Sequence, residues 1–165
     1  YRDIIKEYID RDKTFIAVCG GFPLLGRYYT EGDEKVEGAD VIDIYTEPSD
    51  KRFIGDIVIE SDLIDSTVVG FTNHAGKTYI NGHEPLGKVI YGMGNNGEDT
   101  SEGICFKNVF ATYIHGPLLP KNPKLCDFIL ERTLRTKYDD FRSLLPLDDS
   151  LEEKAHNFIL ERYVK

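Results

Sequence analysis

The sequence predicts a single α/β domain. Helical periodicity occurs near both ends of the chain, whereas the middle holds short β-branched and aromatic runs separated by polar turns. The 165 residues, 41% of them hydrophobic, are enough for one domain with its own core. No internal repeat or low-complexity linker divides them, so we expect one domain over residues 1–165.

Helices are predicted where apolar residues recur at intervals of three and four in a charged background. The pattern favours helices over residues 2–10, 123–138 and 151–163, and a further helix is expected to start within 24–30. The apolar face of the segment 123–138 consists of Leu125, Phe128, Ile129 and Leu134. In the last segment Ser150 and Glu153 would form a capping box. The inner face of that last helix would consist of Leu151, Ala155, Phe158 and Ile159.

Seven runs are typical of β-strands because they are rich in β-branched and aromatic residues and are bounded by turn residues. They cover residues 14–18, 40–46, 52–60, 66–74, 87–91, 103–107 and 109–115. The first run, with charge before it and Gly-Gly after it, predicts a buried strand. Lys107 and Asn108 suit a tight hairpin turn between the last two runs.

Charge and cysteine content exclude several classes of protein. The 29 acidic and 20 basic residues give a formal charge of -9, which opposes binding to nucleic acid or anionic lipid. The chain holds no run of 18 apolar residues and starts with a charged segment, so we expect neither a membrane span nor a secretory signal, and a cytoplasmic location. Three widely spaced cysteines favour reduced thiols over a disulfide framework or a zinc site. We expect no metal or cofactor, and structural roles for Cys105 and Cys126.

The stretch FIAVCGGFPLLG places Cys19 where the first predicted strand ends and two glycines begin. A strand that turns at once into a helix can hold a reactive side chain above the sheet, and small residues permit the turn. The N–H of Gly20 would then point at the same spot and stabilise an oxyanion. His115, at the end of the run 109–115, could stand at the same sheet edge as a base. On the residues alone an inert buried cysteine stays equally open. Taken by itself, His115 is more typical of a structural polar residue.

The glycine-rich stretch YGMGNNGED at 91–99 has a composition found in phosphate-binding loops. It is acidic, however, and no Gly-Lys-Ser/Thr follows it. We therefore expect a flexible loop at the rim of the site.

Five separated blocks go beyond a generic pattern: VCGGFPLLGRYY at 18–29, RFIGDIVIE at 52–60, GFTNHAGKTY at 70–79, PLGKVIYGMGNNGEDTSEG at 85–103 and KNVFATYIHGPLLPKNP at 107–123. In this order they resemble the cobyric-acid-synthase-like class I glutamine amidotransferases, over roughly residues 1–138. Within that family they are most similar to the glutamine amidotransferase subunits of lipid II isoglutaminyl synthases, the Gram-positive enzymes that amidate the cell wall. The resemblance implies a flavodoxin-like class I glutamine amidotransferase fold.

The resemblance also implies catalytic roles for matching positions. Cys19 matches the nucleophile that attacks the carboxamide of L-glutamine, forms a γ-glutamyl thioester and releases ammonia. His115 matches the base, and Gly20 matches an oxyanion donor. Position 117 is proline where other class I amidotransferases carry an acidic residue, so a Cys-His dyad is implied.

Three further positions match residues near the family's site. Arg52 stands where the subfamily keeps an arginine, and its guanidinium suits the α-carboxylate of glutamine. A surface cation at the start of a strand is the alternative for Arg52. Asn73 and His74 match a block that lines the same face, where they would support the site or face a partner.

The chain departs from the family pattern in three ways. Pro23 replaces the usual glutamine, although a first helical turn accommodates proline. Thr72 stands where relatives often carry an acidic residue. The nucleophile follows several βα units in the family but lies at position 19 here, so we expect a C-terminal fragment that lacks the N-terminal βα units. The helix 2–10 would then have lost strands on which it packs, and an exposed sheet edge would pair with another chain.

The resemblance thus implies a glutaminase, an enzyme that supplies ammonia. Its partner would be a Mur-ligase-like, ATP-dependent synthetase subunit that forms a heterodimer with it and amidates the D-glutamate of lipid II in peptidoglycan synthesis. The chain's lack of a nucleotide-binding loop fits that division of labour. Two alternatives stay open: the glutaminase domain of a cobyric acid synthase in cobalamin synthesis, and a non-catalytic scaffold that only binds the synthetase.

Overall fold

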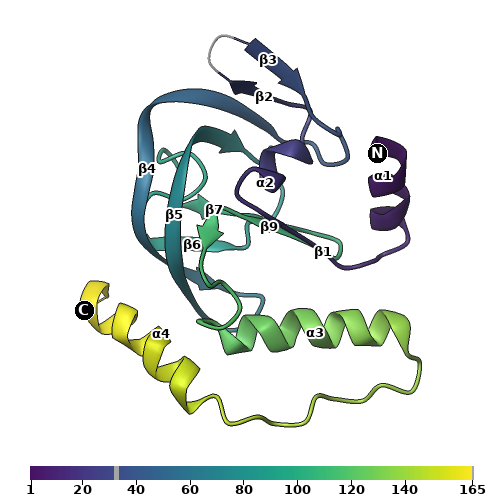
Figure 1. Cartoon of the computed structure of the whole chain (residues 1–165), viewed down its shortest axis with the longest axis vertical. Helices are drawn as coiled ribbons and strands as arrows, with labels where there is room; N and C mark the ends of the chain where they lie inside the picture. Colours follow the sequence, from purple (N-terminus) through teal and green to yellow (C-terminus); the bar gives the residue numbers. More distant parts are fainter. Residues whose placement is uncertain (32–33, 165) are drawn as a thin grey trace.

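Two β-sheets with helices around them make up the fold (Figure 1). The computed structural model describes residues 1–31 and 34–164. In these ranges the helices are α1 (Arg2–Asp10), α2 (Gly21–Leu24), α3 (Pro123–Lys137) and α4 (Ser150–Tyr163). The strands are β1 (Phe15–Val18), β2 (Tyr28–Glu31), β3 (Glu34–Glu37), β4 (Tyr45–Ser61), β5 (Ser66–Tyr79), β6 (Gly87–Tyr91), β7 (Ser101–Glu102), β8 (Ile104–Phe106), β9 (Val109–Thr112) and β10 (Ile114–His115).

The smaller sheet has the order β1-β9-β8. β1 runs parallel to β9, with Val18 opposite Thr112. β8 and β9 form the predicted hairpin, which turns at Lys107 in the left-handed conformation with φ of 53°. Ile16 and Val18 remain 40% and 38% exposed, so the prediction of a buried strand is wrong for one face of β1. Among the described residues, nothing covers that face fully.

The larger sheet has the order β10-β5-β4-β2-β3, with β6 and β7 joined to β4. The two predicted strands 40–46 and 52–60 are in fact one long strand, β4, which begins at Tyr45 and pairs with β5. The pairing shifts between Pro48 and Phe53, because four residues of β4 face a single residue of β5. This bulge of several residues takes residues 49–52 out of the ladder of paired residues.

The prediction that a helix starts within 24–30 is also wrong. α2 ends at Leu24, and the chain then enters β2. Gly26 passes so close to the residue before β4 that an added Cβ would lie 2.6 Å from the carbonyl oxygen of Ile44. Pro23 lies in the first turn of α2, where its missing N–H needs no partner.

The helix α3 follows the prediction, because its Leu125 and Ile129 are buried in a cluster with Phe110 and Ile114. α4 confirms the predicted helix over 151–163, but the predicted inner face is wrong: Leu151 and Phe158 are 72% and 63% exposed.

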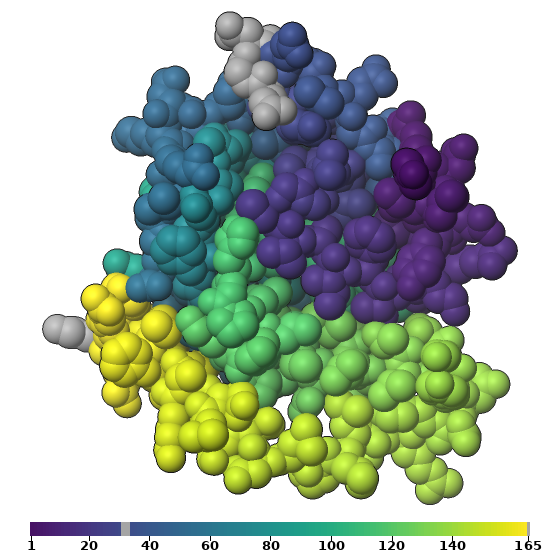
Figure 2. Space-filling view, viewed as in Figure 1, coloured from purple at the N-terminus to yellow at the C-terminus, as the bar shows by residue number. Residues whose placement is uncertain are grey.

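Polar contacts hold α4 instead. The His156 ring lies 2.8 Å from both the Thr67 hydroxyl and the carbonyl oxygen of Lys121, and the Tyr163 hydroxyl donates to Asp56. The N-cap is Asp149 without a side-chain cap bond, so the predicted capping box does not form. α4 is thus a surface layer over the ends of β4 and β5, visible in yellow in Figure 2. No helix in the described ranges is long and apolar enough to cross a membrane.

Asn122, directly before α3, fixes β5 to the chain that leads into this helix. Its Oδ1 accepts from the N–H of Val69, and its Nδ2 donates to the carbonyl oxygens of Val69 and Leu118. We predict that Asn122→Ala lowers the free energy of unfolding by about 3 kcal/mol, because it leaves buried backbone groups without partners. The same substitution at the exposed Asn157 should change it by less than about 0.5 kcal/mol. Urea unfolding measures both values, and equal losses would contradict this role of Asn122.

Candidate active site

Cys19 lies at a sharp bend between β1 and α2. Its φ of 53° is left-handed, a conformation that costs a non-glycine residue roughly 1–2 kcal/mol. Two backbone bonds hold the bend: Cys19 N–H donates to the carbonyl oxygen of Thr112 and Phe22 N–H donates to that of Cys19, both at 2.9 Å. The thiol is half-buried, not sealed in the core. The predicted strand-to-helix turn is therefore present, with the geometry that displays a nucleophile.

The strands bring Cys19 and His115 to the same stretch of β5. The parallel pairing of β1 and β9 places the carboxyl ends of both strands at one sheet edge. The chain then passes through Tyr113 into β10, where His115 is opposite Phe71. The Cys19 Sγ lies 4.0 Å from the carbonyl oxygen of Asn73, two residues along β5 from Phe71.

The β4 bulge brings Arg52 to the same asparagine. Arg52 Nε donates to Asn73 Oδ1 at 2.6 Å, so Asn73 contacts both the thiol and the guanidinium. Among the described residues, Arg52 forms no ion pair with a carboxylate. An exposed guanidinium in this setting can bind an incoming carboxylate in bidentate fashion.

His74 is a buried, neutral neighbour of this group. Its ring stacks on Tyr113 at 3.6 Å between centroids, and its Nδ1 lies 2.9 Å from the carbonyl oxygen of Gly76. Burial is the main cause that lowers the pKa of His74 to about 4; the nearby Arg52 guanidinium acts in the same direction, and the hydrogen bond to Gly76 opposes both. His74 is therefore uncharged near neutral pH, and it packs beside the site.

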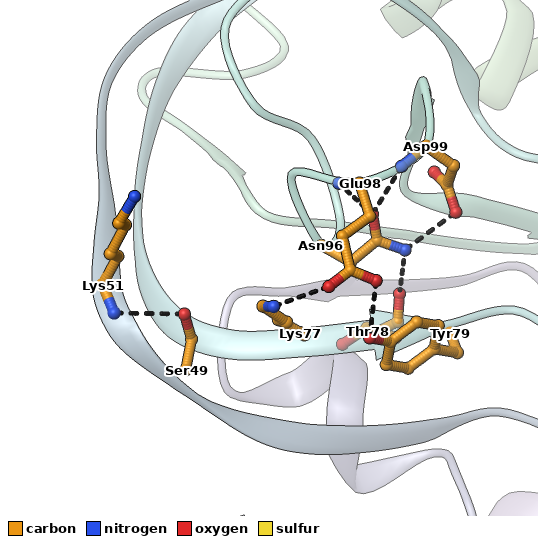
Figure 3. A network of polar contacts seen from close by, with 8 residues as sticks. All are labelled: Ser49, Lys51, Lys77, Thr78, Tyr79, Asn96, Glu98 and Asp99. Carbon is orange, nitrogen blue, oxygen red and sulfur yellow. Dashed lines mark hydrogen bonds and ion pairs between the residues drawn. The ribbon is translucent and has the colours of Figure 1, made fainter.

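The loop 92–99 borders the site through Phe53. An added Cβ at Gly97 would lie 2.8 Å from the Phe53 ring, and that ring in turn packs on His74 at 4.9 Å between centroids. Side-chain hydrogen bonds link residues of this loop to one another. Figure 3 shows the buried Asn96, whose Oδ1 accepts from the backbone N–H groups of Glu98 and Asp99.

Sequence reasoning did not single out Glu102. This carboxyl group is fully buried, and its Oε1 accepts from the Thr112 hydroxyl at 2.6 Å and from Tyr113 N–H at 2.9 Å. Burial raises the pKa of Glu102 to about 7, against the opposing effect of these two hydrogen bonds. The one sequence signal that could have pointed to Glu102 is its position as an acidic residue next to a glycine, directly before an apolar run.

The other cysteines have different surroundings. Cys105 lies in β8 and Cys126 in α3, and burial raises the pKa of both thiols, as expected of structural cysteines. All three cysteines are free. Within residues 1–31 and 34–164, no group of three or more His, Cys, Asp or Glu is placed to hold a metal ion.

The model of the CobB/CobQ-like glutamine amidotransferase domain matches residues 1–123, well over half of the chain. The chain belongs to the CobB/CobQ-like glutamine amidotransferase family. This CobB/CobQ-like chain also has a solved structural neighbour, described as a crystal structure of glutamine amidotransferase. That neighbour superimposes with a TM-score of 0.53 at 16% identity and covers 80% of this chain and 67% of its own. The fold is accordingly the flavodoxin-like class I glutamine amidotransferase fold.

Two relatives of this CobB/CobQ-like chain are named lipid II isoglutaminyl synthase (glutamine-hydrolyzing) subunit GatD. The protein from Streptococcus pneumoniae is 42% identical over 93% of this chain and 60% of its own length. The protein from Staphylococcus aureus is 42% identical over 96% of this chain and 64% of its own length. A probable cobyric acid synthase from Methanosphaera stadtmanae is 30% identical over 69% of this chain and 25% of its own length. The chain thus spans about three fifths of the length of the GatD relatives.

We predict that His74 makes folding stability depend on pH. Its pKa is about 4 when folded, below its ordinary 6.5, so the unfolded chain binds a proton first as the pH falls. The contribution of His74 should therefore fall by about 2 kcal/mol between pH 8 and pH 5. Glu102 acts in the opposite direction, because its raised pKa favours the folded state at lower pH.

The variant His74→Asn separates the two contributions, since it keeps a donor near Gly76 but does not titrate. Relative to wild type, it should be more destabilising at pH 8 than at pH 5 in urea unfolding. An equal destabilisation at both pH values would show that His74 is not held neutral.

Proposed function

We propose that the chain is the glutamine-hydrolysing part of a lipid II isoglutaminyl synthase. It would release ammonia from L-glutamine and supply it to an ATP-dependent, Mur-ligase-like synthetase subunit, which amidates the D-glutamate of lipid II. The observation that carries the proposal is Cys19 in its left-handed bend, next to an asparagine that also holds the guanidinium of Arg52. The 42% identity to two GatD subunits supports the lipid II assignment.

In the proposed reaction, the Cys19 sulfur attacks the carboxamide carbon of glutamine. His115 accepts the thiol proton and transfers it to the leaving nitrogen, so that ammonia departs and a γ-glutamyl thioester remains. Water then hydrolyses the thioester to glutamate and restores the thiol. The buried His115 Nε2 has no hydrogen-bond partner among the described residues, and it therefore has a free position for this proton.

Gly20 would stabilise the oxyanion of the tetrahedral intermediate. It is the N-cap of α2 and follows the nucleophile directly. The first N–H groups of a helix have no intrahelical acceptor, so the Gly20 N–H is available to a developing negative charge.

Arg52 would bind the α-carboxylate of glutamine. Its exposed guanidinium is oriented by Asn73 and has no carboxylate partner in the described part of the chain. The neighbouring His74 is neutral, which leaves Arg52 as the permanent cation in this group.

The synthetase partner is inferred from sequence and from relatives. The chain holds no complete G-x-x-x-x-G-K-[ST] nucleotide loop: its one Gly-Lys-Thr, residues 76–78, lies within strand β5, and Phe71 stands where the first glycine would be. This favours ATP chemistry on another polypeptide. Both GatD relatives are named as subunits, and they match this chain more closely than the 30% identical cobyric acid synthase does. Three free cysteines suit the reducing cytoplasm as the place of action.

We predict that Cys19→Ser abolishes ammonia release from glutamine, measured with the intact gene product and its synthetase partner. The hydroxyl of serine is a far weaker nucleophile at neutral pH than a thiolate. Cys126→Ser, a matched substitution in α3, should keep most of the activity. No ammonia from the wild-type pair would favour the scaffold alternative instead.

We also predict that Arg52→Ala raises KM for glutamine by about 100-fold, because it removes a charge-assisted contact to the α-carboxylate. Arg52→Lys should recover only part of the loss, since an ammonium cannot form the bidentate pair. Lys51→Ala, a change at the adjacent exposed cation, is the control and should leave KM near the wild-type value. A normal KM in Arg52→Ala would identify Arg52 as a surface cation.

A further inference from the structure

Glu102 occupies the point where one strand changes sheets. β9 belongs to the smaller sheet and ends at Thr112, whereas β10 belongs to the larger sheet and begins at Ile114. Glu102 Oε1 accepts from the Thr112 hydroxyl and from Tyr113 N–H. The hydroxyl oxygen of Thr112 in turn accepts from Ile114 N–H at 2.9 Å. One buried carboxyl oxygen thus fixes three consecutive residues, 112–114, which we call the corner.

The corner connects the two proposed catalytic groups. At the N-terminal end of the corner, the carbonyl oxygen of Thr112 accepts from the N–H of Cys19. At the C-terminal end of the corner, Ile114 is followed directly by His115, whose strand β10 pairs with β5. A change in the corner would therefore move the thiol and the imidazole relative to each other.

Close backbone contacts and hydrogen bonds surround Glu102. Gly103 is left-handed with φ of 64°, and an added Cβ there would lie 2.5 Å from the carbonyl oxygen of Ala111. The buried side chain of Asn95 accepts from Gly103 N–H and donates to its carbonyl oxygen. Asn95 of the loop 92–99 thus holds the backbone next to the residue that carries the carboxyl group.

We propose that Glu102 is a positioning residue for glutamine hydrolysis, which sets the distance between Cys19 and His115 through the corner. The proposal rests on the proposed function. The carboxyl group touches neither glutamine nor the reacting atoms in this scheme. Its effect should appear in the rate of the chemical step and not in substrate binding.

The test compares variants of the intact gene product in complex with its synthetase. Glu102→Ala should lower kcat for ammonia release by about 100-fold and change KM less than about 3-fold, because a misplaced catalytic group slows chemistry without altering binding. Glu102→Gln keeps an oxygen at the Oε1 position and should recover kcat to within about 10-fold of wild type. Thr112→Val should also lower kcat, and the double variant Glu102→Ala/Thr112→Val should be no worse than the poorer single variant.

A control separates positioning from stability. Ser61→Ala removes another fully buried polar contact, the bond from its hydroxyl to the carbonyl oxygen of Leu86. It should lower the melting temperature but leave kcat within about 2-fold of wild type. If Glu102→Ala does not fold, Glu102→Gln and Thr112→Val still test the corner.

A second readout does not depend on glutamine turnover. The rate at which iodoacetamide alkylates Cys19, followed by mass spectrometry, reports how well the imidazole supports the thiolate. It should fall about 10-fold in Thr112→Val and stay unchanged in Ser61→Ala. Wild-type values of both kcat and the alkylation rate in folded corner variants would overturn the inference. A wild type that releases no ammonia but shows the expected alkylation pattern would overturn the proposed function alone.

Discussion

The arrangement of the site depends on a few hydrogen bonds at Thr112–Ile114, where the chain passes from one sheet to the other. Cys19 is held by the smaller sheet, through its backbone bond to Thr112. Asn73 and Arg52 belong to the larger sheet, on β5 and β4. The two sheets meet near this crossing, so their relative placement determines whether thiol, imidazole and guanidinium face one ligand. A buried carboxyl group with short bonds to backbone and hydroxyl donors suits that task, because such bonds are strong where water is excluded.

The left-handed bend at Cys19, directly after β1, is a second constraint on the site. A non-glycine residue adopts that conformation only when its surroundings enforce it, and the surroundings here are the bond to Thr112 and the first turn of α2. Strain of this kind is common at catalytic positions. The exposed face of β1 shows that burial on both sides of the strand is not what holds the bend. The backbone bonds suffice in the described part of the chain.

The sequence predicted those parts of the site whose signals are local. An apolar run that ends in Cys-Gly-Gly predicts a strand followed by a sharp turn, and the structure has that turn at Cys19. The position of Arg52 was predicted only through the family resemblance, because the bulge that presents it depends on pairing with β5. Periodicity divided β4 into two strands for the same reason. Glu102 escaped notice since nothing in its neighbourhood along the sequence shows that it will be buried against Thr112.

The helix α4 illustrates the same limit in another way. Its apolar residues recur at helical spacing, and this correctly predicted a helix but not which face packs. The contacts of His156 and Tyr163 with distant residues decide the orientation, and they turn Leu151 and Phe158 outward. Hydrophobic periodicity predicts an element well, whereas its docking depends on polar partners far away in the chain.

The charges around the proposed site favour a small ligand with one carboxylate group. The chain carries a formal charge of -9, which disfavours polyanions at long range. Next to the thiol, burial keeps His74 neutral, so it adds no second positive charge beside Arg52. Glu102 is shielded from any ligand by complete burial, and it acts on the site through Thr112 and Tyr113. Beside the thiol, the exposed guanidinium of Arg52 therefore offers one binding point for one carboxylate.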